Sequence, residues 1–401
     1  YASMETPLFE LGEVFERGIG SATDVVEKEL FRVSASRGEE GERWALRPEA
    51  TAGIVRAYVQ HGLQTWPQPV KVSLLGPMFR YDRPQAGRFR QFFQWDVEAI
   101  GDAGPAVDAE IIELGHRFYR EAGLSDVSVL LNSIGDPACR PTYVEALRAH
   151  FAPHEVLLVG VEKERFTTNP LRLLDSKDPD LAELIATAPT ITERLCDPCR
   201  THFEAVKGHL EALGINYRLA PRLVRGLDYY TRTAFEFYRQ GAEGQQSALA
   251  GGGRYDGLVE LLGGKPTPGI GFAIGLDRVV LALAEAGLAA SPPDHPTVVV
   301  CGADPPDTVT RLRIATDLRA AGVSARAELN VRKLGRQLEN AARDGAHFAV
   351  ILGDELGQGN VQLRDLPAAT QKVVHLDDLA RELIRAHASH RHGMPSAAER
   401  A

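Results

Sequence analysis

An arginine-rich segment, Arg80 to Glu98, brings together residue types that bind anions in proteins. Pro84 and Gly87 mark a turn between two strand-like flanks, so the segment predicts a β-hairpin. Because side chains alternate along a strand, one face of the second strand is expected to carry Arg88, Arg90, Phe92, Gln94, Asp96 and Glu98. Guanidinium groups bind phosphate oxygens in pairs, and a phenyl ring can stack on a base. This face therefore suits a polyphosphate, a flat ring and a small zwitterion.

The opposite face of the same strand carries Phe89, Phe93, Trp95 and Val97, and we expect it to pack into a core. A second interpretation treats the whole segment as an exposed edge strand, whose charges prevent pairing with other chains. The hairpin pattern is compatible with either interpretation.

A glycine-rich segment, Gly269 to Leu281, predicts a strand that runs directly into a helix. Arg278 falls in or near the first helical turn, where the helix dipole disfavours a cation by up to about 1 kcal/mol. A bound anion would offset that cost, and so would an ion pair with the neighbouring Asp277.

Three further segments contain candidate ligand-binding groups. In Arg47–Thr51, which leads into a predicted helix, Glu49 and Thr51 could hold an amino group, or Glu49 could only complement the helix dipole. The segments Arg225–Thr231 and Ala250–Leu258 flank a predicted strand. The second has three successive glycines, which suit a close backbone approach to a ligand but also a flexible hairpin tip.

The composition is that of a globular protein with two or three domains, since 44% of its 401 residues are hydrophobic. No apolar run reaches the length of a membrane span and no secretory pattern opens the chain, so we expect a cytoplasmic protein without a membrane partner. Four scattered cysteines are too few for a disulfide framework.

The net charge of −9 argues against sequence-blind coating of nucleic acids. From Thr297 onward there are 14 Lys and Arg and 13 Asp and Glu, a net charge of +1 that leaves −10 to the preceding part. The C-terminal part is therefore the less repulsive surface for a polyanion.

Prolines divide the chain into two domains. Residues 291–296 contain three prolines and predict a linker. Residues 1–290 predict an α+β domain with a mainly antiparallel core, into which a helical insertion enters at about 141–216. Residues 297–387 alternate strand and helix patterns, which predicts a small α/β domain with a largely parallel sheet, and residues 388–401 predict a flexible tail.

Within the first domain, helices are expected at Pro48–Gln60 and Pro105–Glu121, each followed by a glycine. In the second domain, strands are expected at 297–301, 323–328, 348–352, 361–363 and 373–375, and helices at 307–321, 332–344 and 377–387.

Taken together, these segments resemble the histidyl-tRNA synthetase family of class II aminoacyl-tRNA synthetases, over nearly the whole chain. Arg80–Glu98 resembles class II motif 2, Gly269–Leu281 resembles motif 3, and Arg47–Thr51 resembles the family's Arg-Pro-Glu-Gly-Thr. Arg225–Thr231 and Ala250–Gly264 resemble the two histidine-specific signatures. These two signatures separate the histidine-specific family from other class II enzymes, since motifs 2 and 3 recur across the whole class. The resemblance implies an antiparallel catalytic core followed by a class IIa anticodon-binding domain.

The resemblance also implies a role for each matching residue. ATP would be held by Arg80 at the α-phosphate, by Arg83 and Arg88 at the outer phosphates, by Phe92 at adenine and by Arg278 from the other side. Histidine would be held by Glu49, Thr51 and Gln94 at its amino group and by Glu98 and Tyr230 at its imidazole, with Tyr229 as a further histidine-binding residue. Arg225 would contact the histidine carboxylate and the α-phosphate, and Arg225 and Arg80 are the implied catalytic residues.

The implied reaction is attack of the histidine carboxylate on the α-phosphorus of ATP, followed by acyl transfer to the 3′ end of tRNA-His. Positioning and charge stabilisation by arginines and Mg²⁺ would supply most of the catalysis. The tRNA would contact Arg83 and Gln85 and, in the second domain, a basic helix face. That face consists of Arg332, Lys333 and Arg336, which could also be merely solvated.

Residues Ala2–Thr23 resemble the later part of motif 1, with a short helix at Glu10–Glu16, so a homodimer is implied. The printed sequence starts at Tyr1, inside that motif, and leaves the strength of the dimer open.

A zinc site is one interpretation of Cys196 and Cys199, with His202 and His209 nearby. The histidines follow the cysteines too closely for the usual zinc loop, so a helix start is favoured and no metal ligands are expected among the side chains.

Two other functions remain open. One is a non-catalytic paralogue, such as the synthetase-like regulatory subunit of ATP phosphoribosyltransferase or a tRNA-sensing module. Such paralogues tend to lose the histidine signatures or the anticodon domain, so the presence of Arg80, Arg225, Tyr230 and Arg278 favours the enzyme. The other is a different class IIa synthetase, which the Arg225–Tyr230 segment disfavours.

Overall fold

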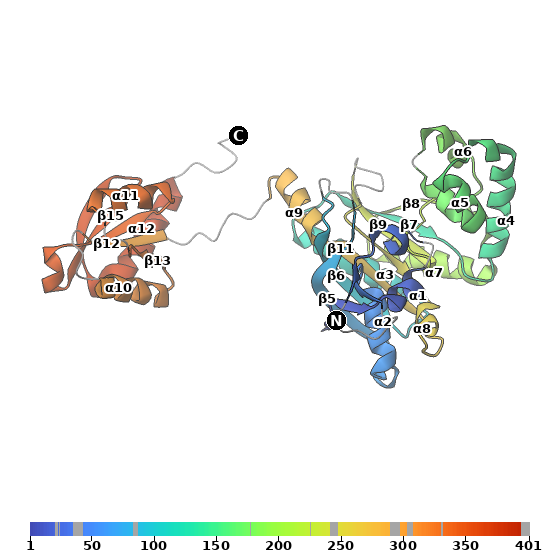
Figure 1. Ribbon diagram of the computed structural model, residues 1–401, viewed down its shortest axis with the longest axis horizontal. Coiled ribbons are helices and arrows are strands. Elements are labelled where there is room, and N and C mark those ends of the chain that lie inside the picture. Colours follow the sequence, from blue (N-terminus) through green and yellow to red (C-terminus); the bar gives the residue numbers. More distant parts are fainter. Residues whose placement is uncertain are drawn as a thin grey trace. The chain divides into compact units, whose positions relative to one another are not determined.

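The computed structural model describes residues 1–20, 23, 25–34, 43–82, 87–176, 178–224, 226–240, 248–288, 297–302, 308–329 and 332–393. The chain divides into two compact units, Tyr1–Ala289 and Ala290–Ala401, each with its own hydrophobic core (Figure 1). Within the described ranges, no helix combines the length and the apolar character needed to cross a bilayer.

An eight-stranded sheet forms the centre of the first unit, in the order β1-β5-β6-β11-β10-β9-β7-β8. Its strands are β1 (Ala2–Ser3), β5 (Val70–Phe79), β6 (Gln91–Ile100), β7 (Val127–Ser133), β8 (Tyr217–Leu219), β9 (Thr231–Arg239), β10 (Ala250–Arg254) and β11 (Gly269–Gly275). Only the pairs β1–β5 and β7–β8 are parallel, so the expected antiparallel core is confirmed. Strand β6 lies inside this sheet, so the interpretation of Arg80–Glu98 as an exposed edge strand is wrong. Strand β10 also lies inside it, so the interpretation of the three glycines as a flexible hairpin tip is wrong as well.

The remaining elements of the first unit surround this sheet. A small sheet, in the order β2-β4-β3, consists of β2 (Phe9–Leu11), β3 (Arg32–Val33) and β4 (Trp44–Leu46). The α-helices are α1 (Gly12–Ile19), α2 (Thr51–Gln60), α3 (Pro105–Glu121), α4 (Arg140–Phe151), α5 (Val161–Thr168), α6 (Ala182–Ala186), α7 (Asp197–Ala212), α8 (Leu258–Leu261) and α9 (Leu276–Glu285). Short 3₁₀ turns occupy Leu63–Thr65, Ala152–Leu157, Pro170–Asp175, Pro179–Leu181 and Ile191–Arg194, and Val25–Glu29 is a π-helical turn.

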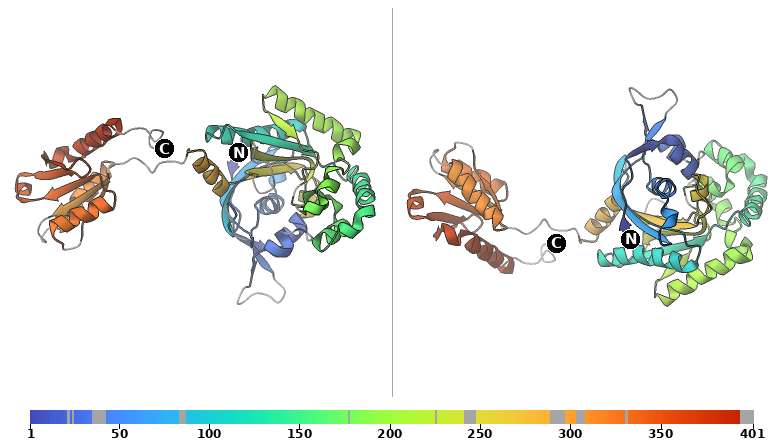
Figure 2. Two further views of the ribbon diagram at one scale, coloured as in Figure 1. Left: turned by 90° about the horizontal axis from the view of Figure 1, so that it is seen from above. Right: turned by 90° about the horizontal axis from the view of Figure 1, so that it is seen from below.

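The two faces of the main sheet have different partners. Helix α3 covers one face, where Trp95 packs against Phe118 with ring centroids 5.2 Å apart and Phe237 packs against Tyr119 at 5.5 Å. Helix α7 packs against α3, and Figure 2 shows both on this side of the sheet. The alternate residues of β6 therefore point to the opposite face, over which α2 begins.

Two predictions about this region were inaccurate. Helix α2 begins at Thr51 instead of Pro48, because the Glu49 carboxylate accepts the N–H groups of Thr51 and Ala52 at 2.9 Å each and caps the helix from outside it. Phe89 and Phe93 are not in the core, since 47% and 46% of their surfaces are exposed. On that face of β6, the side chains that α3 covers are those farther along the strand, beginning with Trp95.

The described residues of the predicted insertion contain four α-helices. Helices α4, α5 and α6 lie to one side of the main sheet and appear in green in Figure 1. Helix α7 instead returns along α3, and its buried residues Phe203, Val206 and Leu210 belong to the main hydrophobic core.

The second unit is a five-stranded sheet in the order β13-β12-β14-β15-β16. Its elements are β12 (Thr297–Gly302), α10 (Thr308–Ala320), β13 (Ser324–Ala327), α11 (Leu334–Arg343), β14 (Phe348–Leu352), a 3₁₀ turn (Asp354–Gln358), β15 (Asn360–Asp365), β16 (Thr370–His375), a 3₁₀ turn (Leu376–Asp378) and α12 (Leu379–Gly393). The largely parallel sheet was a wrong prediction, because β14–β15 and β15–β16 are antiparallel. Their short connections leave no room for the crossover that parallel strands need.

Helix α12 also continues to Gly393, past the predicted start of the tail at residue 388. Residues 388–393 contain no proline, and Pro395 is the first residue beyond them that cannot continue a helix.

Candidate active site

A cavity of about 350 Å³ lies on the face of the main sheet opposite α3. Ten of the predicted site residues line it: Glu49, Thr51, Arg80, Arg88, Phe92, Gln94, Glu98, Tyr229, Tyr230 and Arg278. Arg83, Gln85 and Arg225 lie outside the described residues. The structure thus gathers residues from four separate segments of the chain around one space.

Glu98 is the centre of a buried polar pocket in this cavity. Its carboxylate accepts hydrogen bonds from Thr51 Oγ1 and from Tyr255 Oη, each at 2.6 Å. Burial raises the pKa of Glu98 to about 8, and the nearby Glu49 carboxylate adds to the shift. The Glu98 carboxyl therefore holds a proton more tightly than an ordinary glutamate.

Tyr255 was not among the predicted site residues. It follows β10, in the segment that resembles the second histidine-specific signature, and its ring packs edge-on against Tyr229 at 5.9 Å between centroids. The sequence feature that could have identified Tyr255 is its position directly after a glycine-rich strand. Its contact with Glu98, however, depends on how β10 and β6 are placed in the sheet, which the sequence does not show.

Glycine at position 271 makes room for Glu98. The two residues are direct partners across β6 and β11. A Cβ atom at position 271 would lie 1.7 Å from Glu98 Oε2 and 2.5 Å from the backbone oxygen of Val97. A side chain cannot be accommodated there unless the carboxylate moves.

Gln94 and Asp96 precede Glu98 on the same face of β6. They are 9% and 1% exposed, and among the described residues Gln94 Oε1 and both carboxylate oxygens of Asp96 have no hydrogen-bond partner. Burial, followed by the charge of Glu98, raises the pKa of Asp96 well above its ordinary value. Acceptors of this kind are costly to bury alone, and a cationic amino group would satisfy them.

Glu49 has two sets of partners. Besides capping α2, it accepts a hydrogen bond from Tyr229 Oη at 3.4 Å. The Tyr229 and Tyr230 rings lie 4.6 Å apart, and both side chains are less than 10% exposed. Glu49 therefore both caps α2 and lines the cavity, so the two roles considered for it do not exclude each other.

Three guanidinium groups converge at the other end of the cavity. Burial lowers the pKa of Arg278, and the positive charges of Arg88 and Arg80 lower it further. Arg80 lies over the Phe92 ring, with its guanidinium carbon 5.3 Å from the ring centroid, and Arg88 forms an ion pair with Asp82 at 2.8 Å. Mutually repelling cations beside an aromatic ring are what a nucleotide polyphosphate requires.

Arg278 is held by backbone oxygens rather than by its neighbour Asp277. Its Nε donates to Gly87 O at 3.2 Å and its Nη1 donates to Ala248 O at 2.5 Å. Asp277 instead accepts the N–H of Phe93 at 2.8 Å. The alternative in which Asp277 neutralises Arg278 is therefore wrong.

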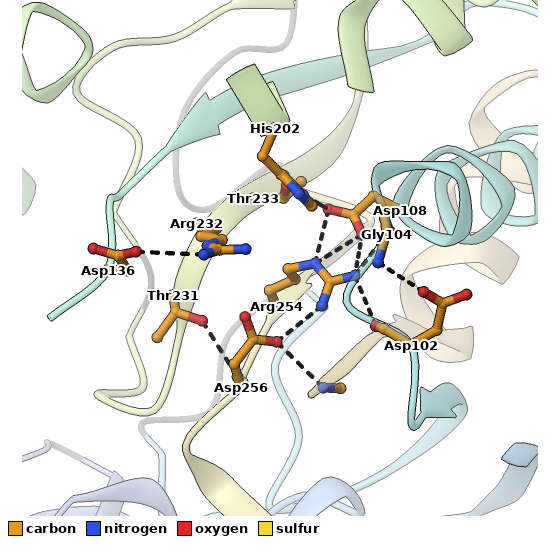
Figure 3. A network of polar contacts seen from close by, with 11 residues as sticks. Asp102, Gly104, Asp108, Asp136, His202, Thr231, Arg232, Thr233, Arg254 and Asp256 are labelled. Carbon is orange, nitrogen blue, oxygen red and sulfur yellow. Dashed lines mark hydrogen bonds and ion pairs between the residues drawn. The ribbon is translucent and has the colours of Figure 1, made fainter. Parts of the chain in front are cut away.

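A buried ion-pair network supports the cavity from the other side of β10 (Figure 3). Arg254 Nε donates to Asp108 Oδ1 at 2.9 Å, and its Nη2 donates to the backbone oxygens of Asp102 and Gly104 at 3.0 Å each. His202 Nε2 lies 2.9 Å from Asp108 Oδ2. The network ties α3 and α7 to the sheet. It also turns His202 toward Asp108, so this histidine is not available for the cysteine–histidine zinc site, which the sequence spacing already disfavoured.

The predicted basic helix face of the second unit is only partly helical. Arg332, Lys333 and Arg336 are all exposed, but α11 begins at Leu334 because Lys333 has an extended backbone, with φ −56° and ψ 141°. Arg336 is the member of the set that lies within the helix.

Comparisons with known proteins agree with this geometry. Residues 1–148 and 164–279 match the family model described as histidyl-tRNA synthetase, and residues 297–386 match the anticodon binding domain. The histidine–tRNA ligase of Moorella thermoacetica is 48% identical over 377 residues, which cover 94% of this chain and 88% of that relative. That of Symbiobacterium thermophilum is 45% identical over 393 residues, covering 97% and 90%.

Solved structures give the same result. The apo histidyl-tRNA synthetase of S. aureus has a TM-score of 0.75 at 34% identity, and the match covers 96% of this chain and 91% of that chain. A Bacillus halodurans structure described as an ATP phosphoribosyltransferase regulatory subunit/histidyl-tRNA synthetase has a TM-score of 0.58 at 22% identity, over 85% and 87% of the two chains, which shows the fold alone. The resemblance and the class II fold expected from the sequence are confirmed, and the chain belongs to the histidyl-tRNA synthetase family.

Proposed function

We propose that this protein activates histidine with ATP to form histidyl-adenylate and transfers the histidyl group to the 3′ end of tRNA-His. The observation that carries the proposal is one cavity with an arginine cluster at one end and a buried carboxylate pocket at the other. The regulatory paralogue is the weaker alternative, because the relatives that are 45–48% identical are named histidine–tRNA ligases.

ATP fits the arginine end of the cavity. Arg80, Arg88 and Arg278 would hold the phosphates, and Phe92 would stack on adenine. Mg²⁺ would be bound mainly through the phosphates with one or two carboxylates, and the candidates that line the cavity are Asp82, which also pairs with Arg88, and Glu236, which also accepts a hydrogen bond from Tyr238. When bound, Mg²⁺ supplies neutralisation of the phosphate charge.

Histidine fits the carboxylate end. Asp96, Gln94 and Glu49 would receive the α-ammonium group, since their acceptors face the cavity. An imidazole N–H would donate to Glu98, with Thr51 and the neighbouring tyrosines orienting the carboxylate. A pocket with buried acceptors discriminates strongly against amino acids without a matching donor, because those acceptors would stay unpaired.

The family resemblance supports the remaining assignments. Arg225 would contact the histidine carboxylate and the α-phosphate, and Arg83 and Gln85 would contact the tRNA acceptor end. Arg332, Lys333 and Arg336 would contact the anticodon region, since all three are exposed and the domain matches an anticodon binding model.

We also propose a cytoplasmic homodimer. Strand β1 is an exposed edge of the main sheet, and Leu75 on the adjacent β5 is 67% exposed. An apolar side chain that is exposed beside the edge strand, as Leu75 is among the described residues, suits a subunit interface. Light scattering on a gel-filtration column should give twice the chain mass for the wild type and a smaller mass for Leu75→Asp.

ATP–pyrophosphate exchange, with each of the twenty amino acids offered in turn, tests the proposed activity. We expect exchange with histidine alone. Arg225→Ala should depress exchange far more than ATP binding, whereas Arg117→Ala, on the exposed side of α3, should leave both unchanged. An unchanged exchange rate in Arg225→Ala would reject the role of that residue. No exchange with any amino acid, in a folded protein, would favour the regulatory paralogue.

A further inference from the structure

Four potential metal ligands converge where helices α4 and α7 begin: Asp136, Cys139, Cys196 and Cys199. One ligand atom from each residue lies within 4.8 Å of the other three. Asp136 Oδ1 is 3.6 Å from Cys139 Sγ and 3.8 Å from Cys196 Sγ. In tetrahedral zinc sites, with Zn–S bonds of about 2.3 Å and Zn–O bonds of about 2.0 Å, neighbouring ligand atoms are about 3.5–3.8 Å apart. The two distances from Asp136 agree with these values, and the other ligand atoms, within 4.8 Å of one another, need to move by only about 1 Å to reach them.

We propose that these four residues bind a structural Zn²⁺ ion through three thiolates and one carboxylate. A zinc site at Cys196 and Cys199 needs a second pair of ligands. In the sequence, the nearby candidates are His202 and His209, which follow the cysteines too closely for the usual zinc loop. In the structure, that pair consists of Asp136 and Cys139, which directly precede the insertion. They are three positions apart in the sequence, as Cys196 and Cys199 are. A set of four protein ligands, three of them sulfur, favours Zn²⁺ over Mg²⁺ or Ca²⁺, which prefer oxygen ligands.

The surroundings of the cluster are built for ligation. Cys139 is the N-cap residue of α4 and Cys196 is that of α7, so each of these cysteines lies at the positive end of a helix dipole, which favours the thiolate form. Cys139 and Cys199 are buried, while Cys196 and Asp136 are partly exposed and leave an entry path.

Asp136 is oriented from outside the cluster. Its Oδ2 pairs with Arg232 Nη2 at 3.5 Å, as Figure 3 shows, and this leaves Oδ1 on the side of the sulfurs. An outer partner that fixes the orientation of a ligand is a regular feature of metal sites.

Gly135 permits the close packing of the first ligand pair. Its φ of +65° is in the left-handed region that favours glycine. A Cβ atom there would lie 2.8 Å from Cys139 Sγ. The backbone is therefore shaped to bring Asp136 and Cys139 onto one centre.

The site has a direct connection to the active-site cavity. Arg140, next to Cys139, donates from Nη2 to the backbone oxygen of Tyr230 at 2.6 Å. A metal ion that fixes the start of α4 would therefore also fix the Tyr230 segment. This effect on histidine binding rests on the proposed function, whereas metal binding itself does not.

Metal analysis of the full chain tests the proposal. Protein produced with added zinc and then desalted should contain about one zinc ion per chain. Cys139→Ser and Cys199→Ser should lose most of it, and Cys301→Ala should keep it, because Cys301 lies in β12 of the second unit. The Co²⁺-loaded wild type should have the absorption bands of tetrahedral thiolate coordination, and Asp136→Cys should retain metal and strengthen the thiolate band.

Three results would overturn the proposal. These are a wild-type zinc content below about 0.1 per chain, an unchanged zinc content in the double variant Cys139→Ser/Cys199→Ser, and a thiol titration of the unfolded wild type that finds two of the four cysteines in a disulfide. The wild-type measurements stand even if a variant fails to fold. Loss of zinc without any change in histidine exchange kinetics would reject only the connection to Tyr230.

Discussion

Replacing Gly271 with alanine should damage histidine recognition more than ATP binding. A Cβ atom at this position would lie 1.7 Å from Glu98 Oε2, and ordinary contact begins near 3.4 Å, so the oxygen must move by at least 1.7 Å. Its hydrogen bonds to Tyr255 and, through the other oxygen, to Thr51 are only 2.6 Å long, so a displacement of that size breaks them.

The expected magnitudes follow from these contacts. A lost hydrogen bond to a charged or strongly polar ligand group costs about 1.5–3 kcal/mol, which corresponds to about a 10- to 150-fold loss in kcat/KM for histidine. The two broken bonds to Glu98 would lower the free energy of unfolding by about 1–3 kcal/mol. The 2.5 Å approach to the Val97 backbone oxygen adds strain that a side chain cannot relieve.

The assay is ATP–pyrophosphate exchange with histidine titrated at saturating ATP, together with urea unfolding. Gly208→Ala is the matched control, because Gly208 lies inside α7 with open space around its Cβ position. In a Glu98→Ala background the colliding carboxylate is gone and only the close contact with the Val97 backbone oxygen remains, so Gly271→Ala should lower kcat/KM by a smaller factor there than in the wild type. A wild-type KM for histidine in the single variant would refute the reasoning.

Three further predictions concern buried charges. Burial raises the pKa of Glu98 to about 8 from the ordinary glutamate value of 4.5, so the folded state binds this proton more tightly than the unfolded state. The free energy of unfolding should therefore fall by up to about 1.4 kcal/mol per pH unit as the pH rises from about 4.5 to 8. Glu98→Gln should lose that contribution, so parallel pH profiles from urea melts would contradict the shift. Arg278→Ala should raise the KM for ATP by about 10- to 150-fold with little effect on the KM for histidine, and the reverse pattern in exchange kinetics would exclude a phosphate role. Asp108→Asn should destabilise the protein by up to about 3–5 kcal/mol, because it removes one of the two carboxylates that pair with the fully buried Arg254 and leaves only Asp256, and a urea midpoint near that of the wild type would argue against the network.

Parts of the site could be predicted because they depend on local periodicity. The two-residue period of a strand was enough to assign Gln94 and Glu98 to one face of β6, and the glycine-to-helix pattern was enough to position Arg278. Contacts that depend on register between distant strands could not be predicted, so Tyr255 was missed although its segment was recognised.

The remaining misses have the same origin. A helix start was favoured at Cys196 and Cys199, and α7 does begin at Asp197, but no local pattern connects that pair to Asp136 and Cys139. Burial of Phe93 was predicted from alternation alone, whereas burial also requires a partner to cover that stretch of the sheet.

The position of β11 between β6 and β10 has a consequence for biosynthesis. Strand β6 ends at residue 100, but its partner β11 begins only at residue 269, roughly 170 residues later. At about 5–20 residues per second, a ribosome needs on the order of ten to thirty seconds to produce that interval. Throughout this time β6 has an open edge, so the nascent chain depends on rapid pairing with β5 and on its charged side chains to avoid association with other chains.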